Sequence, residues 1–131
     1  MPNPPLPEEY AALLREPNAA VIGTVMPDGS PHTVATWYLW DDGRVLVNMD
    51  GERARLAWMR DDPRVSLTVL LEDWSQHISL RGRVIEFVGG EQGLDDIDRI
   101  SRHYIGRPYP VRDRERVSAW IEISTWHAWG F

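Results

Sequence analysis

The sequence predicts a small α+β fold in which mostly antiparallel strands close into a barrel and helices are inserted between them. Three observations favour this. Short apolar, β-branched segments recur along the chain, glycine-containing turns separate several of them, and three other stretches have helical character. About six strands and three helices are expected, in one domain spanning residues 1–131.

The first half of the chain predicts one helix followed by three strands. A helix is expected at 7–16, because Pro and Glu suit a first helical turn and two leucines give it an apolar side. The strands are expected at 19–26, 32–40 and 44–49. The turns PDGS and DDG separate them, since Pro fixes φ and Gly accepts a positive φ. The three strands are therefore expected to form an antiparallel meander.

A short helix is predicted at 52–60, ending before Pro63 because proline disfavours helical geometry in the residue that precedes it. A buried strand is expected at 65–71 and a long strand at 77–88. In the second strand, apolar residues such as Ile78, Leu80 and Val84 alternate with residues that face the other side. Gly82 within it indicates a bulge or a close approach of another backbone.

The last third of the chain begins with a predicted helix at 91–105, where apolar residues recur at helical spacing and Gly106 is a plausible C-cap. Its acidic residues Asp95, Asp96 and Asp98 are interpreted as a solvated face. An irregular loop is expected at 107–114. A strand at 115–124 and a second short strand at 125–131 complete the chain.

Composition narrows the classes of function. The net charge of −6 argues against a nucleic-acid-binding protein, whose affinity rests largely on basic surface. There are no cysteines, which excludes thiol nucleophiles and thiolate metal sites. All 14 basic residues are arginine, which excludes a Schiff-base lysine. The four histidines are scattered without metal-ligand spacing, so no metal site is expected.

No apolar run approaches the roughly 18 residues that a membrane span needs, so no membrane partner is expected. The initial segment MPNPPLPEEY has neither the basic flank nor the apolar core of a secretory signal. We therefore expect a cytoplasmic protein.

The strongest local signal is a pair of arginines, Arg53 and Arg55, at the start of the helix predicted at 52–60. Two guanidiniums in a first turn are locally disfavoured, because the helix dipole places partial positive charge there as well. The conflict indicates an external anion that accepts bonds from free N–H groups and both side chains. The alternative is a solvated helix face beside Glu52 and Asp61.

The order and spacing of several motifs resemble the flavin and deazaflavin oxidoreductases related to pyridoxamine phosphate oxidase. The motifs are PDGSPH, WYLWDDGRVLVN, GERARLAWMRDDPRVSL, LRGRV and the C-terminal WIEISTWHAWG. The resemblance implies a split β-barrel homodimer with cofactor grooves at the subunit interface. One branch of this family uses FMN and another uses the deazaflavin coenzyme F-420, and this short chain looks more like the second.

The resemblance also implies positions for the cofactor. Arg53 and Arg55 fall where the family grips the cofactor phosphate, and Leu56 would offer a backbone N–H. Relatives commonly carry Lys where Arg55 stands, and arginine keeps the charge while adding a bidentate fork. The ring is implied to lie along neighbouring strands, against Ala35, Thr36, Trp37, Val47 and Asn48. The loop at 107–114 is expected near the substrate or the other subunit.

The function implied is an F-420-dependent oxidoreductase that transfers a hydride to a small conjugated or heteroaromatic substrate. Its cofactor would supply the chemistry, and the protein would supply the positioning and the electrostatic environment. Two alternatives stay open: an FMN-binding oxidase or reductase on the same scaffold, and a non-catalytic protein that binds F-420 or haem. His103 is a candidate proton donor. The sequence does not name the substrate.

Overall fold

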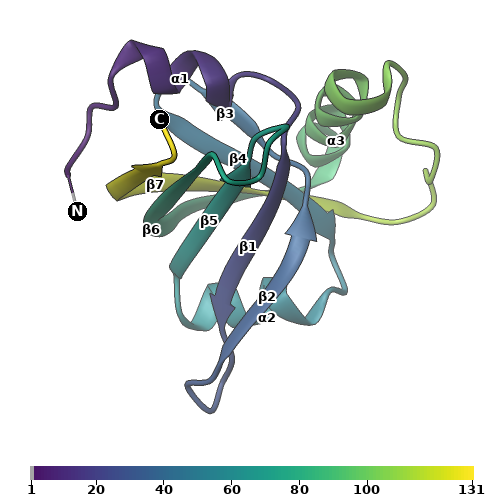
Figure 1. The fold of residues 1–131 in the computed structure, drawn as a ribbon. Helices are drawn as coiled ribbons and strands as arrows, with labels where there is room; N and C mark the ends of the chain where they lie inside the picture. Colours follow the sequence, from purple (N-terminus) through teal and green to yellow (C-terminus); the bar gives the residue numbers. More distant parts are fainter. Residues whose placement is uncertain (1) are drawn as a thin grey trace.

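The computed structural model describes residues 2–131, in which seven strands form one antiparallel sheet accompanied by three helices (Figure 1). The strand order is β2-β1-β5-β6-β7-β4-β3. The helices are α1 (Glu8–Leu14), α2 (Ala54–Asp61) and α3 (Gly90–Ile105). The strands are β1 (Ala19–Val25), β2 (Pro31–Thr36), β3 (Leu39–Asp41), β4 (Arg44–Asp50), β5 (Arg64–Leu70), β6 (His77–Val88) and β7 (Arg116–Trp129).

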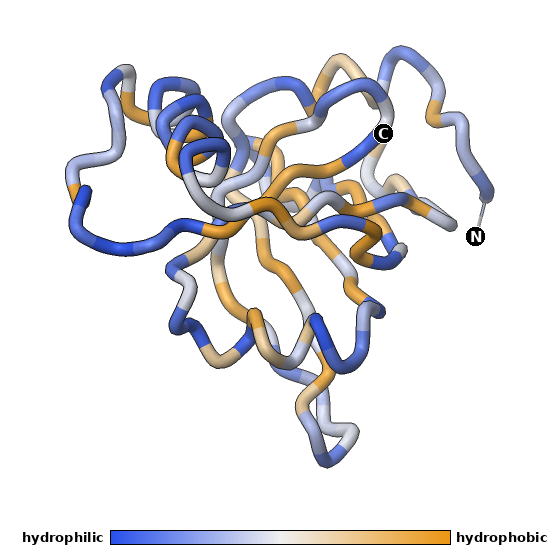
Figure 2. Tube along the Cα trace, turned by 180° about the vertical axis from the view of Figure 1, so that it is seen from behind, coloured by the Kyte–Doolittle hydropathy of each residue, from blue (hydrophilic) through white to orange (hydrophobic). Residues whose placement is uncertain are grey.

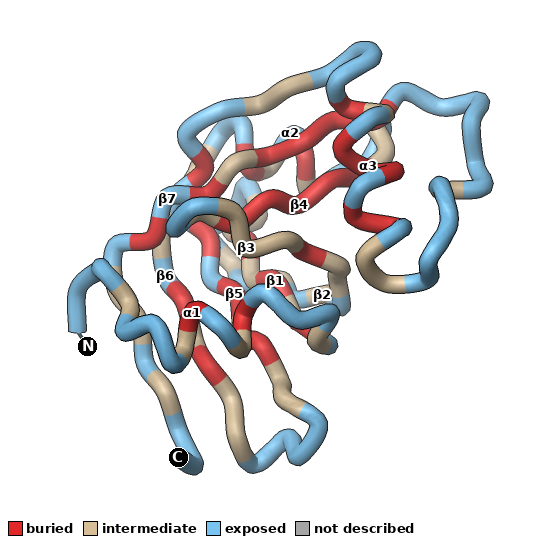
Figure 3. Tube along the Cα trace, turned by 90° about the horizontal axis from the view of Figure 1, so that it is seen from above, coloured by how far each residue is buried: buried red, intermediate tan, exposed pale blue. Residues whose placement is uncertain are grey.

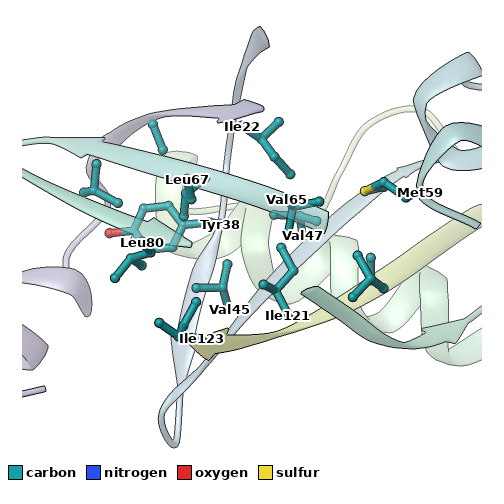
Figure 4. Close-up of a cluster of buried hydrophobic side chains, with 14 of the residues drawn as sticks. Ile22, Tyr38, Val45, Val47, Met59, Val65, Leu67, Leu80, Ile121 and Ile123 are labelled. Carbon is teal, nitrogen blue, oxygen red and sulfur yellow. The ribbon is translucent and has the colours of Figure 1, made fainter. Parts of the chain in front are cut away.

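The sheet curls around an apolar core, which Figure 4 shows in close-up. Alternate residues of β1, β5 and β6 are buried, as expected for strands with one face on the core. Every residue from Val45 to Met49 of β4 is buried, because α3 also packs on this strand. The apolar segments lie inside the fold and the hydrophilic ones at its periphery, as Figure 2 shows. This confirms the predicted α+β barrel.

The single strand predicted at 32–40 is wrong: it is broken at Trp37 and Tyr38 into β2 and β3. Both predicted hairpins occur, since β1 pairs with β2 and β3 pairs with β4. The two hairpins lie at opposite edges of the sheet, so β2 does not pair with β4 and the continuous meander is not formed. Tyr38 accounts for the break, because its ring is fully buried and its hydroxyl donates to the Leu14 carbonyl at 2.8 Å. Burial raises the pKa of this hydroxyl.

The C-terminal segment forms one continuous strand, β7, where two were predicted. Its pairing with β6 continues through the expected break to Trp129, whereas its pairing with β4 ends at Glu122. The prediction for Gly82 is confirmed. The ladder between β6 and β7 shifts register there, and a Cβ would collide with the Glu122 carbonyl oxygen.

Helix α3 confirms the predicted helix and its left-handed C-cap at Gly106, whose φ is 77°. Figure 3 shows buried and exposed segments alternating along α3. Its acidic residues differ from the prediction, since only Asp95 is exposed, while Asp96 and Asp98 are buried. Both carboxylates are hydrogen-bonded, which is the usual condition for burying such groups. None of the helices within residues 2–131 has the length and apolar character of a membrane span.

Candidate functional site

A pocket of about 270 Å³ opens where the end of β2 meets β4, α2, α3 and the start of β7. Helix α3 packs on β7 and β4 (Figure 1). Its residues Ile97 and Ile100 line one side of the pocket. The pocket is lined by Ala35, Thr36, Trp37, Asn48, Arg55, Ile97, Ile100, Tyr109 and Arg116. It therefore combines an apolar wall with two arginines.

The apolar wall is built on an aromatic stack. Trp37 lies on Tyr104 with ring centroids 5.1 Å apart and planes inclined by 10°. The Tyr104 hydroxyl donates to the Asn18 carbonyl at 2.7 Å, and this bond holds the Tyr104 ring in place. Burial raises the pKa of Tyr104 to about 12. Only Trp37 of this pair lines the pocket, so Tyr104 supports the indole ring against which a planar ligand would stack.

The start of α2 is shaped by Asp50, at the end of β4. Its carboxylate accepts the Glu52 N–H at 2.8 Å, and its carbonyl accepts the Arg53 N–H at 3.0 Å. The helix that follows has no side-chain cap and no acidic residue in its first turn. It begins at Ala54, so Arg53 is its N-cap residue, and only Arg55 of the predicted pair lies within the first turn.

Arg55 is the most informative side chain of the pocket. Its Nε atom is buried and has no hydrogen-bond partner. Burial lowers the pKa of this guanidinium, and the positive charges of Arg53 and Arg116 lower it further. Arg55 as a whole is half-buried and forms no ion pair within residues 2–131. A partly desolvated cation without a counter-charge is costly, so this arrangement favours an anion from outside the chain.

Arg116 is the second cation of the pocket, and the sequence reasoning missed it. Its Nε donates to the Asn48 side-chain oxygen at 2.9 Å, and its guanidinium lies over the Tyr109 ring, 4.7 Å from the centroid. Burial lowers its pKa as well. The available signal was strand alternation, because Arg116 is in phase with Ser118, opposite to the core residues Val117 and Ala119.

Of the residues predicted for the cofactor, five line the same pocket: Ala35, Thr36, Trp37, Asn48 and Arg55. Val47 and Leu56 do not, since both are buried in the main core. The Leu56 N–H already donates to the Arg53 carbonyl at 3.1 Å, so it is not free for a ligand. Arg53 is exposed and lines an adjoining pocket of about 450 Å³, which shares Tyr109 and Arg116 with the first.

The loop predicted at 107–114 reaches the pocket through Tyr109. Asp98 of α3 fixes this loop, because it accepts the Tyr109 N–H at 3.0 Å and the Arg112 guanidinium at 2.6 Å. The bond from Arg112 is the main reason that the pKa of Asp98 lies below its usual value. His103 packs against Tyr104 and does not line the pocket.

A family model described as pyridoxamine 5'-phosphate oxidase matches residues 6–130. The chain belongs to this family. It is a family of flavin-type oxidoreductases. The matched range includes all seven strands, all three helices and every residue of the pocket. Within residues 2–131, no group of three His, Asp or Glu side chains is arranged to hold a metal ion.

Solved structures share the fold. An F-420 reductase is 24% identical with a TM-score of 0.82, and the match covers 93% of this chain and 98% of that one. A conserved hypothetical protein from Mycobacterium tuberculosis is 23% identical with a TM-score of 0.78, covering 97% and 86%. General stress protein 26 from Bacillus anthracis is 16% identical with a TM-score of 0.69, covering 93% and 92%. The comparison with curated proteins gives no match.

Proposed function

We propose that this protein is an oxidoreductase dependent on coenzyme F-420, acting on a small conjugated or heteroaromatic substrate. The observation that carries the proposal is the buried, unpartnered Nε of Arg55 beside a flat aromatic wall. A planar cofactor with an anionic arm matches both features, since the ring lies on the wall and the arm supplies the missing negative charge. The fold shared with an F-420 reductase supports this choice.

The residues present fit such a group. Trp37 and Ile100 would face the ring, while Arg55 and Arg116 would bind an anionic oxygen of the arm. Arg53, in the adjoining pocket that Asp50 and Glu52 also line, would contact a longer anionic tail. When bound, the deazaflavin supplies a two-electron hydride transfer, and the protein contributes orientation and exclusion of water. No side chain of the pocket is assigned as a proton donor.

A homodimer is part of the proposal. A pocket of about 270 Å³ is slightly below the roughly 300–1,000 Å³ typical of small-molecule sites, so one chain would enclose the ring only in part. A partner subunit covering the open side would complete the groove. Analytical ultracentrifugation of the purified protein measures its oligomeric state. A monomer that binds the cofactor without dimerising would contradict the proposal.

FMN is the second candidate, because the family description names an oxidase and the two arginines would serve a terminal phosphate equally well. Titration of the purified protein with F-420 and with FMN, followed by cofactor fluorescence, separates the two. We expect tighter binding of F-420. Tighter binding of FMN would overturn the choice of cofactor but keep the site.

The non-catalytic alternatives make different predictions. Sequestration of F-420 predicts tight binding with no turnover across a panel of enones, quinones and nitroheterocycles. Haem binding would need an axial ligand such as histidine, and no histidine of residues 2–131 lines the pocket. We therefore expect no Soret shift on haem addition, and such a shift would favour the haem-binding interpretation.

A further inference from the structure

A chain of buried hydrogen bonds runs from α3 through two strands to the pocket. It links Asp96, Ser118, Asn48 and Arg116, which are four of the seven buried polar residues in the described part of the chain. Ser118 lies 2.7 Å from the Asp96 carboxylate, Asn48 lies 3.0 Å from Ser118, and Arg116 lies 2.9 Å from Asn48. We call this chain the Asp96 relay.

The direction of every bond in the relay follows from chemistry. The Gly93 carbonyl only accepts and lies 2.8 Å from the Asn48 amide, so the NH₂ group faces it. The Arg116 Nε only donates, so the Asn48 oxygen faces Arg116. The same NH₂ donates to Ser118, whose own hydroxyl must therefore donate to the Asp96 carboxylate. The relay thus begins at an acceptor-only carboxylate and ends at a donor-only guanidinium.

The Asn48 amide has little capacity left for a ligand. Both of its N–H donors and one oxygen lone pair are used within the relay. Arg116, in contrast, uses only its Nε in the relay, and the residue lines both pockets. The carboxylate that acts on Arg116 is Asp50, whose negative charge raises the pKa of the guanidinium against the effect of burial. Arg116 forms no ion pair within residues 2–131, so it keeps capacity for an external anion.

We propose that Arg116 is a ligand-binding residue that contacts an anionic oxygen of the bound molecule, and that Asn48, Ser118 and Asp96 are positioning residues that act through it. This inference rests on the proposed function for the nature of the ligand, but its structural half is independent of any ligand. It replaces the direct cofactor contact that the sequence predicted for Asn48 with an indirect one.

Two fully buried serines give a matched pair for the test. Ser118 is a link of the relay, whereas the Ser101 hydroxyl, on α3, has no hydrogen-bond partner. In the free protein, we expect the Arg116 Nε–H proton to give an exchange-protected NMR signal, assigned by its loss in Arg116→Lys. Ser118→Ala should expose this proton to exchange with solvent, and Ser101→Ala should not. A signal that stays protected in Ser118→Ala would overturn the relay.

The second readout is a double-mutant cycle on the affinity for F-420 and, separately, for FMN. Ser118→Ala should weaken binding roughly 2- to 10-fold, the loss expected for one ordinary hydrogen bond. In the Arg116→Ala background the same substitution should have no effect on affinity. An equal effect in both backgrounds would overturn the positioning role, because it would mean that Ser118 acts on the pocket without Arg116.

The two proposals fail differently. If neither cofactor binds the wild-type protein, the proposed function falls, as does the ligand contact of Arg116, while the NMR comparison still decides the relay. If Ser118→Ala does not fold, Asp96→Asn keeps the shape and removes the charge at the start of the relay. It is then expected to expose the Arg116 proton in the same way, and an unchanged signal would count against the inference.

Discussion

Replacing Arg55 by methionine should have opposite effects on ligand affinity and on the stability of the free protein. The substitution keeps an unbranched side chain of similar length in the pocket wall but removes the charge and the unpartnered Nε donor. Arg53 and Arg116, whose positive charges lower the pKa of Arg55, would then lose a like-charged neighbour. The free protein should therefore become more stable, because an unpartnered donor and a charge repulsion are removed. The ligand should bind more weakly, because it loses a hydrogen-bond donor and a counter-charge.

The magnitudes follow from the two environments. A charge-assisted hydrogen bond contributes roughly 1.5–3 kcal/mol, so the loss of one predicts roughly 10- to 150-fold weaker binding of F-420. A buried donor without a partner costs roughly 1–3 kcal/mol. Recovering about 1 kcal/mol of this would raise the Tm by about 4 °C in a domain of this size.

Fluorescence titration measures the affinity and thermal unfolding without ligand measures the stability. Arg60→Met is the matched control, because it removes the same charge from the same helix at a residue that packs on Phe87 outside the pocket. It should leave the affinity unchanged. An Arg55→Met protein with lower Tm and unaltered affinity would refute the reasoning, since it would make Arg55 an ordinary structural residue.

Three further substitutions test the frame around the pocket. Gly82→Ala should destabilise by roughly 1–3 kcal/mol in denaturant unfolding, because the added Cβ collides with the backbone of β7, whereas Gly51→Ala meets only ordinary contacts; equal stabilities would contradict this. Asp98→Asn should lower the Tm at pH 7. The folded-state pKa of this carboxyl is lowered, so its contribution to the free energy of unfolding is present above the unfolded-state pKa and lost as the pH falls through the folded-state pKa. The difference in Tm between the wild type and Asp98→Asn should therefore shrink below about pH 4. A difference in Tm that stays constant with pH would argue against the ion pair. Tyr104→Phe should cost about 1 kcal/mol through the lost hydroxyl bond but leave cofactor affinity intact, because the aromatic stack remains; a large loss of affinity would give the hydroxyl a binding role.

Most of the elements were predictable because their signals are local. The boundaries of β6 were predicted as they occur, since strict alternation and a glycine pair mark the strand and its end. The C-cap at Gly106 was predictable for the same reason: a left-handed residue after a helix favours glycine whatever surrounds it. The motif with Arg53 and Arg55 located α2 to within two residues at each end.

The candidate site was predictable only in part. The residues Ala35 to Trp37 and Arg55 were implied by the family resemblance, because they lie in or beside motifs of contiguous sequence and all line the pocket. Arg116 was not, because its importance depends on Asn48, 68 positions away in the chain. The burial of Asp96 was missed because an acidic run on a helix usually faces solvent, and only the contact with Ser118 reverses that expectation.

The sequence by itself determined the α+β class, the three helices, the position of most strands and an arginine at an uncapped helix start. These follow from periodicity, turn chemistry and helix electrostatics, which act over a few residues. The tertiary structure alone decided that β2 and β3 separate to opposite edges, that Arg116 is the second cation of the pocket, and that Asp96 is buried at the head of a relay. Their physical reason is common: each depends on burying polar or aromatic groups against partners distant in the chain, and a partner is known only once the sheet has closed.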